Sequence, residues 1–191
     1  MKNYFLVTTI TANPFDNKHI KKIILNTIGQ LQKGREHLKV RICDPFSNKQ
    51  TKRIQGTSLI TNDLNPKFNA TYNLEFNDFG EFAKDQNFEF DLILFDPPYS
   101  LSQLKRQYEG IGQLLPQWQC RRMWTRGKDA LAKCVRPGGI VISLGWNSQG
   151  WGKHRGFEKV ALYNFEQSGR EGQYNIQLVI EKKIQHSITD Y

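Results

Sequence analysis

The chain has 191 residues, of which 38% are hydrophobic and 12% aromatic, so it is long enough to bury the core of one domain. Its formal net charge of +9 favours a polyanionic partner such as nucleic acid, although a generically basic soluble protein is the alternative explanation. No apolar stretch approaches the ~18 residues of a membrane span, and the widely spaced Cys43, Cys120 and Cys134 exclude a disulfide framework, so we expect a reduced, cytoplasmic protein with no membrane association.

Apolar periodicity in the first half of the chain predicts one clear helix and several short strands. Lys18 to Leu31 places Ile20, Ile23, Ile24 and Ile28 on one stripe, which is typical of an amphipathic helix. Gly34 suits the end of that helix. The strands expected from alternation are residues 4–10, 38–43, 56–61 and 71–76, with a brief helix over 81–84.

The second half of the chain contains the two most apolar runs. Residues 90–95 are almost wholly apolar and predict a buried strand of a parallel sheet, and residues 140–144 predict a second. The remaining elements expected here are helices over 101–109 and 121–135, a turn at 136–139, and a closing antiparallel hairpin from strands 157–165 and 174–182. Strands alternating with helices predict an α/β fold, a doubly wound and mostly parallel sheet with this C-terminal hairpin at one edge.

The stretch Asp96-Pro97-Pro98-Tyr99 directly follows the first apolar strand and is the most distinctive feature of the sequence. Open α/β sheets bind ligands outside the carboxyl ends of their strands, which is where this tetrapeptide is expected. It combines a carboxylate, two prolines whose φ is held near −65°, and an aromatic ring. A simple turn after a strand is the alternative, but a chance match in a chain of this length has odds on the order of one in a thousand.

Three earlier aspartates also fall at the ends of predicted strands, namely Asp44, Asp63 and Asp78. Asp63 follows Asp44 at the distance, about 20 residues, at which Rossmann-type sites place an acid that binds ribose hydroxyls. A solvated loop aspartate explains each of these residues taken singly. Together with Asp96, they place an aspartate at the end of each of four successive predicted strands, which indicates a ligand cleft at this edge of the sheet.

The tetrapeptide resembles the signature of S-adenosylmethionine-dependent amino-methyltransferases of the Asp-Pro-Pro-Tyr type, the N6-adenine DNA methyltransferase family. The resemblance extends over residues 13–182 and implies a Rossmann-like class I methyltransferase fold, S-adenosylmethionine as cofactor and no metal. It also implies that Asp96, Pro97, Pro98 and Tyr99 are catalytic. An exocyclic amine is a poor nucleophile because its lone pair is delocalised into the ring, so Asp96 and the Pro97 carbonyl would accept its hydrogens while Tyr99 stacks on a flipped-out base.

The same resemblance implies a set of cofactor-binding residues. They are Phe15, Asp44, Pro45, Phe46, Asn48, Asp63, Asp78 and Phe79. In the family, the loop at Asp44-Pro45-Phe46 wraps the methionine half of the cofactor, and Asp78 with Phe79 resembles the pair that contacts the adenine. This chain has Ser47-Asn48 where the family has glycines, and we expect Asn48 to substitute by adopting the left-handed conformation. Phe15 is either a contact to the methionine end or a hydrophobic staple of the first helix.

N6 of adenine in DNA is the leading target that the resemblance implies. RNA remains an alternative, because amino-methyltransferases of ribosomal and transfer RNA share the motif and some modify guanine N2 or cytosine N4. A catalytically silent nucleic-acid-binding subunit is a further alternative, favoured by the altered loop at Ser47-Asn48. We expect residues 1–191 to form a single catalytic domain with no separate target-recognition domain, so short insertions, a homodimer or a partner subunit would supply target recognition.

Basic and aromatic residues alternate in the loops near the expected cleft, which is typical of a surface that binds phosphates and bases. They are Lys49, Lys52, Arg53, Lys105, Arg106, Arg121, Arg122, Arg126, Lys128, Lys153, Arg155, Trp118, Trp124, Trp146 and Trp151. The alternative is that the tryptophans belong to the core and the charges to a solvated face.

Overall fold

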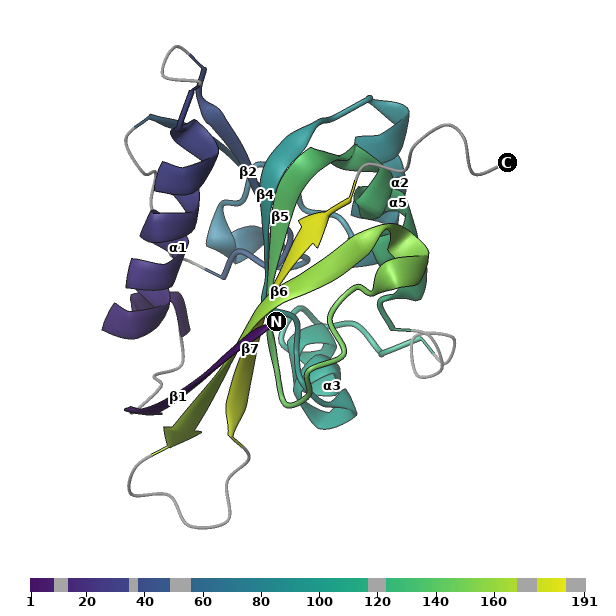
Figure 1. Ribbon diagram of the computed structural model, residues 1–191. Coiled ribbons are helices and arrows are strands. Elements are labelled where there is room, and N and C mark those ends of the chain that lie inside the picture. The colour runs from purple at the N-terminus through teal and green to yellow at the C-terminus, as the bar shows by residue number, and fades with distance from the viewer. Residues whose placement is uncertain (9–13, 35–37, 49–55, 117–122, 168–174, 185–191) are drawn as a thin grey trace.

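A seven-stranded sheet forms the centre of the structure, with strand order β1-β6-β7-β5-β4-β2-β3 (Figure 1). The structure is a computed structural model that describes residues 1–8, 14–34, 38–48, 56–116, 123–167 and 175–184. The strands are β1 (Lys2–Thr8), β2 (Val40–Asp44), β3 (Thr57–Thr61), β4 (Phe90–Phe95), β5 (Val135–Gly145), β6 (Phe157–Gln167) and β7 (Ile176–Lys183). Each pairs parallel with its neighbours except β7, which is antiparallel to both β5 and β6. The predicted mostly parallel sheet with a C-terminal antiparallel hairpin is therefore confirmed, but the hairpin does not lie at the edge of the sheet, because β1 pairs on the outer side of β6.

Helices cover both faces of this sheet. The helix α1 (Lys18–Gln32) lies on one face, and α2 (Phe76–Asp85) with α5 (Thr125–Cys134) lies on the other (Figure 1). The inward stripe of α1 is the predicted one, since Ile20, Ile24 and Ile28 are all buried against the sheet. Each such side chain contributes about 1.5–3 kcal/mol by leaving water. None of the helices in the described part of the chain is long and apolar enough to cross a membrane.

The helices α2 and α5 approach each other unusually closely because glycines line their contact. A Cβ on Gly80 would lie 2.8 Å from the backbone of Gly127, and a Cβ on Gly127 would lie 2.4 Å from the Phe76 ring. The buried Asn77 side chain accepts a hydrogen bond of 2.8 Å from the Gly127 amide at the start of α5. This pair therefore forms a rigid layer beneath the carboxyl ends of β2 and β4.

Residues 71–76 do not form the predicted third strand. Only Tyr72 pairs, in an isolated parallel bridge with Asn62. The buried Asn62 side chain takes the place of a strand neighbour, because its amide accepts from the Leu74 N–H and donates to the Leu74 carbonyl, both at 3.0 Å. The chain then enters α2 at Phe76, so the helix predicted over 81–84 is the C-terminal half of a longer one.

Two further predicted boundaries differ from the structure. The turn predicted at residues 136–139 is a bulge within β5, between its pairs with Phe90 and Leu92 of β4. Gly138 has a φ of +79° in this bulge, a conformation that glycine adopts without strain. The helix predicted over 121–135 corresponds to α5, which begins at Thr125, and residues 121 and 122 lie outside the described residues.

Candidate active site

Three of the four predicted aspartates gather at the carboxyl edge of the sheet. Asp44 is the last residue of β2, Asp96 directly follows β4, and Asp63 lies two residues beyond β3. Because β2, β3 and β4 are parallel neighbours, their ends meet at one edge, as the sequence predicted. Asp78 is the exception, because it lies within α2 and not at a strand end.

The Asp96-Pro97-Pro98-Tyr99 motif forms the centre of this edge. The β4 strand before it is buried along its whole length, and Pro97 and Pro98 are buried as well. The Tyr99 hydroxyl donates a 2.5 Å hydrogen bond to Oδ1 of Asp96. Burial raises the pKa of Asp96 from 3.8 to about 6, although the bond from Tyr99 offsets part of that rise. Asp96 is therefore ionised at neutral pH but held in an environment that favours its neutral form, as befits a hydrogen-bond acceptor or base.

The helix α3 (Leu101–Glu109) fixes the end of the motif. Ser100 caps this helix by accepting a 3.2 Å hydrogen bond from the Gln103 amide. The Gln103 side chain in turn accepts a 2.6 Å hydrogen bond from the Tyr99 amide. The backbone at Tyr99 is thus tied to the first turn of α3.

The loop after β2 is supported from inside by Asp44. This side chain is fully buried, and its Oδ1 accepts a 3.2 Å hydrogen bond from the Phe46 amide. Asp44 therefore holds the loop from within the protein, and its predicted contact with the cofactor stays a prediction. The exposed Asn48 does not adopt the left-handed conformation that we expected, since among the described residues only Asn69 and Asn87 combine a positive φ with a side chain. Pro45 and Phe46 are the residues of this loop that line a cavity.

That cavity lies between the ends of β2 and β3, the start of α2, and α3, and its volume is about 20 Å³. It is lined by Pro45, Phe46, Asn62, Asp63, Leu64, Leu74, Glu75, Phe76, Leu104, Gln107, Tyr108 and Trp124. Three of its aromatic rings interlock, because Phe46 stacks on Phe76 at 4.8 Å and meets Trp124 edge-on at 5.1 Å between ring centroids.

Asp63 is the most informative polar residue of this cavity. Burial raises its pKa from 3.8 to about 6, and only the hydrogen bond from the Asn65 amide acts in the opposite direction. Within the part of the chain that the structure describes, Asp63 forms no ion pair. Partial burial of the ionised carboxylate destabilises the folded protein, and hydrogen bonds from the hydroxyl groups of a ligand would offset that penalty.

The structure does not place the predicted pair Asp78 and Phe79 at the cavity. Phe79 is completely buried in the core beneath the sheet, and Asp78 is exposed and paired with Arg126. The cavity instead contains Glu75 and Phe76, one helical turn earlier. Glu75 and Phe76 have the same acid–aromatic order as the predicted pair, and they stand at the start of α2, where we expected a strand. Phe15 is not a lining residue either, since it packs against the core on the α1 face.

The residues of the cavity suit an adenosyl group in chemistry but not in present volume. Aromatic walls from Phe46, Phe76 and Trp124 match a purine ring, and the carboxylates of Asp63 and Glu75 match its hydroxyl and amino donors. A volume of about 20 Å³ holds about one water molecule, so a nucleoside requires the walls to separate.

The architecture matches that of solved methyltransferases. TrmN from Thermus thermophilus aligns with a TM-score of 0.51 at 16% identity, over 91% of this chain and 55% of that one. A SAM-dependent methyltransferase from Agrobacterium tumefaciens gives 0.52 at 10% identity, over 84% and 62%. The N-methyltransferase NodS from Bradyrhizobium japonicum WM9, solved with S-adenosyl-L-homocysteine, gives 0.51 at 10% identity, over 92% and 94%. The fold is that of the class I methyltransferases.

The same comparisons limit what is shown beyond the fold. At these identities the likeness concerns architecture alone, and this chain spans about half the length of TrmN. No protein-family model and no curated protein matches the sequence.

The basic and aromatic residues near the site were expected either to bind nucleic acid or to belong to the core and to a solvated charged face, and the structure contains residues of both kinds. Trp151 is a core residue, with 1% of its surface exposed, and Arg126 and Arg155 are paired with Asp78 and Asp129. Residues 49–55 and 117–122, which include several predicted cations and Trp118, lie outside the described residues. Trp146 differs from Trp151, because 37% of it is exposed.

Proposed function

We propose that this chain transfers the methyl group of S-adenosylmethionine to an exocyclic amino nitrogen of a nucleic-acid base, with N6 of adenine in DNA as the first target to test. One observation carries the proposal. Asp96, partly buried and with its pKa raised to about 6, follows the central strand of a class I methyltransferase fold and is oriented by Tyr99 of the same motif. The net charge of +9 supports a polyanionic substrate.

In this proposal the cofactor supplies an electrophilic methyl group, and the residues of the chain orient the amine. The Asp96 carboxylate accepts one amino hydrogen and the carbonyl of Pro97 accepts the other, which draws the nitrogen lone pair out of the ring and toward the methyl group. As the nitrogen gains positive charge, the same carboxylate stabilises it. The buried prolines and the tie from Gln103 to the Tyr99 amide keep these acceptors in place before the substrate arrives.

Asp63 is proposed to bind the ribose hydroxyls of the cofactor, and Phe46, Phe76 and Trp124 its adenine ring. We expect Asp63→Asn to weaken S-adenosylmethionine binding about tenfold, because a hydrogen bond to a charged acceptor contributes roughly 1.5–3 kcal/mol. Asp78→Asn is the matched control, since Asp78 lies on the exposed side of α2. Calorimetric titration of both variants at pH 8 measures the effect, and equal affinities would remove Asp63 from the cofactor site.

The same titration tests whether the chain is a silent subunit. A nucleic-acid-binding subunit without cofactor chemistry gives no heat with S-adenosylmethionine, whereas the enzyme proposed here does. Asp96→Ala should then abolish methyl incorporation while leaving that heat largely unchanged. Unaltered turnover in Asp96→Ala would remove the assignment of this residue.

The substrate is best identified without assuming a polymer. The protein is incubated with labelled cofactor and a panel of single- and double-stranded DNA and RNA, and the products are digested to nucleosides for mass spectrometry. N6-methyladenine in DNA is the expected product. Label in RNA, on guanine N2 or on cytosine N4 would assign the site to the alternative substrates, and no label in any polymer would refute the proposed function.

A further inference from the structure

An exposed tryptophan stands beside the catalytic motif. Trp146 directly follows β5, the sheet neighbour of β4, and Ser143 of β5 is in register with Phe95 just before Asp96. The indole of Trp146 meets the Tyr99 ring edge-on, with 5.8 Å between ring centroids. Large aromatic side chains with this much exposed surface beside a polar site are typical of binding surfaces.

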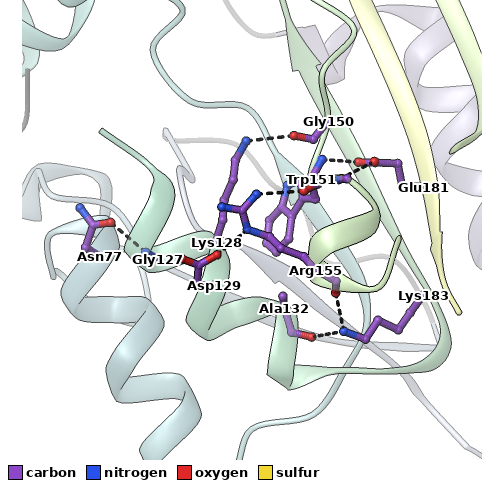
Figure 2. Close-up of polar contacts among 11 residues, drawn as sticks. Asn77, Gly127, Lys128, Asp129, Ala132, Gly150, Trp151, Arg155, Glu181 and Lys183 are labelled. Carbon is purple, nitrogen blue, oxygen red and sulfur yellow. Dashed lines mark hydrogen bonds and ion pairs between the residues drawn. The ribbon is translucent and has the colours of Figure 1, made fainter. Parts of the chain in front are cut away.

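The loop that carries Trp146 is anchored at its other end by buried contacts. Glu181 of β7 is fully buried, and its carboxylate accepts hydrogen bonds from the amides of Trp151 (2.6 Å) and Gly152 (2.9 Å). Lys128 of α5 donates a 3.3 Å bond to the Gly150 carbonyl, and Figure 2 shows Lys128 and Glu181 approaching this segment from different elements. The Trp151 indole fills the core beside Phe95 and Phe157, whereas Trp146, Asn147 and Gln149 are exposed.

The anchoring leaves little room for another arrangement of this loop. Gly150 has a φ of +65°, and a Cβ at that position would lie 2.3 Å from the Glu181 carboxylate. A fully buried carboxylate is tolerated because both of its oxygens receive backbone donors. Buried polar groups therefore hold a short loop on which Trp146 is the exposed aromatic side chain.

We propose that Trp146 is a substrate-binding residue, and that its exposed indole stacks on the target base while Asp96 and Pro97 receive the amino group. The ligand is a single unpaired purine, either from single-stranded nucleic acid or flipped out of a duplex. Tyr99 forms the adjoining wall, because the bond between its hydroxyl and Asp96 holds its ring across that of Trp146. This inference rests on the proposed function, since it assigns a role within the same site.

The kinetic test compares Trp146→Ala with variants that separate stacking from size. With the methyl-accepting strand of the panel as substrate, Trp146→Ala should raise KM roughly tenfold to a hundredfold, the range of one base–aromatic stack. Trp146→Phe should recover most of that loss, and Trp146→Leu should not. Phe5→Ala is the matched control, because Phe5 is 81% exposed on the edge strand β1 and should leave KM unchanged.

A binding test makes the outcome independent of turnover. A DNA oligonucleotide with one 2-aminopurine, a fluorescent adenine analogue, is titrated with wild-type protein and with Trp146→Ala. Weaker binding and a smaller change in emission for Trp146→Ala support the inference, whether or not methyl transfer is found. Absence of methyl transfer would refute only the proposed function. If the wild type methylates and Trp146→Ala keeps its KM and its probe affinity, the inference alone is overturned.

Discussion

Replacing Asp96 by asparagine should remove activity and also make the protein more stable at alkaline pH. Burial raises the pKa of Asp96 from 3.8 to about 6, so the folded protein holds its ionised form less well than the unfolded chain does. A group with a raised pKa contributes its full stability below about pH 4 and loses it as the pH rises through 6. Asparagine has the same shape, keeps an oxygen for the Tyr99 hydroxyl, and carries no charge.

The size of this effect follows from the shift. A rise of about two pKa units corresponds to about 3 kcal/mol at most, and because Asp96 is partly exposed we expect about 1–3 kcal/mol. For a domain of this length, each kcal/mol raises Tm by about 2–4 °C. Asp96→Asn should therefore melt several degrees above the wild type at pH 8, and the difference should disappear near pH 4.

Thermal unfolding followed by circular dichroism at pH 8, 6 and 4 measures this difference. Asp78→Asn serves as control, since its exposed carboxylate pairs with Arg126 at the surface, and it should give no comparable gain at pH 8. Methyl incorporation by Asp96→Asn should fall by about a hundredfold or more, the loss typical of one preorganised polar group. If Asp96→Asn is equally or less stable than the wild type at pH 8, the conclusion that burial destabilises the ionised Asp96 carboxylate is refuted.

Two other predictions test the motif and its support. Tyr99→Phe removes the hydrogen bond that lowers the pKa of Asp96, so the acidic limb of the pH–kcat profile, expected near pH 6 in the wild type, should move to higher pH; a limb that stays in place would contradict the assignment. Gly127→Ala places a Cβ 2.4 Å from the Phe76 ring and should cost about 1–3 kcal/mol in denaturant unfolding. Gly29→Ala, on the exposed side of α1 with open space around it, should instead stabilise by about 0.5–1 kcal/mol, and equal effects of the two substitutions would contradict the packing argument.

The sequence predicted those elements whose apolar pattern is long or continuous. The helix α3 has the predicted limits, Leu101 to Glu109, and the buried strand β4 runs from Phe90 to Phe95 as expected. In these segments periodicity alone selects the structure, because every apolar residue of β4 can be buried only inside a sheet that is covered on both faces. The carboxyl edge of the sheet, and with it the position of Asp96, follows from the same pattern.

The strand predicted over residues 71–76 is wrong because a side chain, and not a neighbouring strand, forms hydrogen bonds with its backbone. Residues 71–76 have the composition of a strand, yet the pairing they find is with the amide of Asn62, which no alternation pattern reveals. The cavity contains Glu75 and Phe76, three residues before the predicted acid–aromatic pair Asp78 and Phe79. The start of α2, at Glu75 and Phe76, lines the cavity. About one turn later, Phe79 faces the core and Asp78 faces solvent.

Residues brought in from distant parts of the chain were beyond prediction for a different reason. Leu104, Tyr108 and Trp124 line the cavity because α3 and the segment before α5 fold back over the ends of β2 and β3. Leu104 and Tyr108 are ordinary core residue types, so the sequence carries no local sign of their role, whereas Trp124 was among the aromatic residues expected near the cleft. Trp146 did carry a sign, since it follows a strand end, but its exposure depends on the buried anchor at Glu181.

The helix α3 connects the two halves of the site. Leu104 and Tyr108 close the cavity on one side, while Gln103, in the preceding turn, accepts the hydrogen bond from the Tyr99 amide. An adenosyl group cannot occupy a cavity of about 20 Å³ unless these walls move. Because α3 is a continuous helix that starts at the motif, the residues that line the cavity and the residue that binds the Tyr99 amide lie within two turns of one helix.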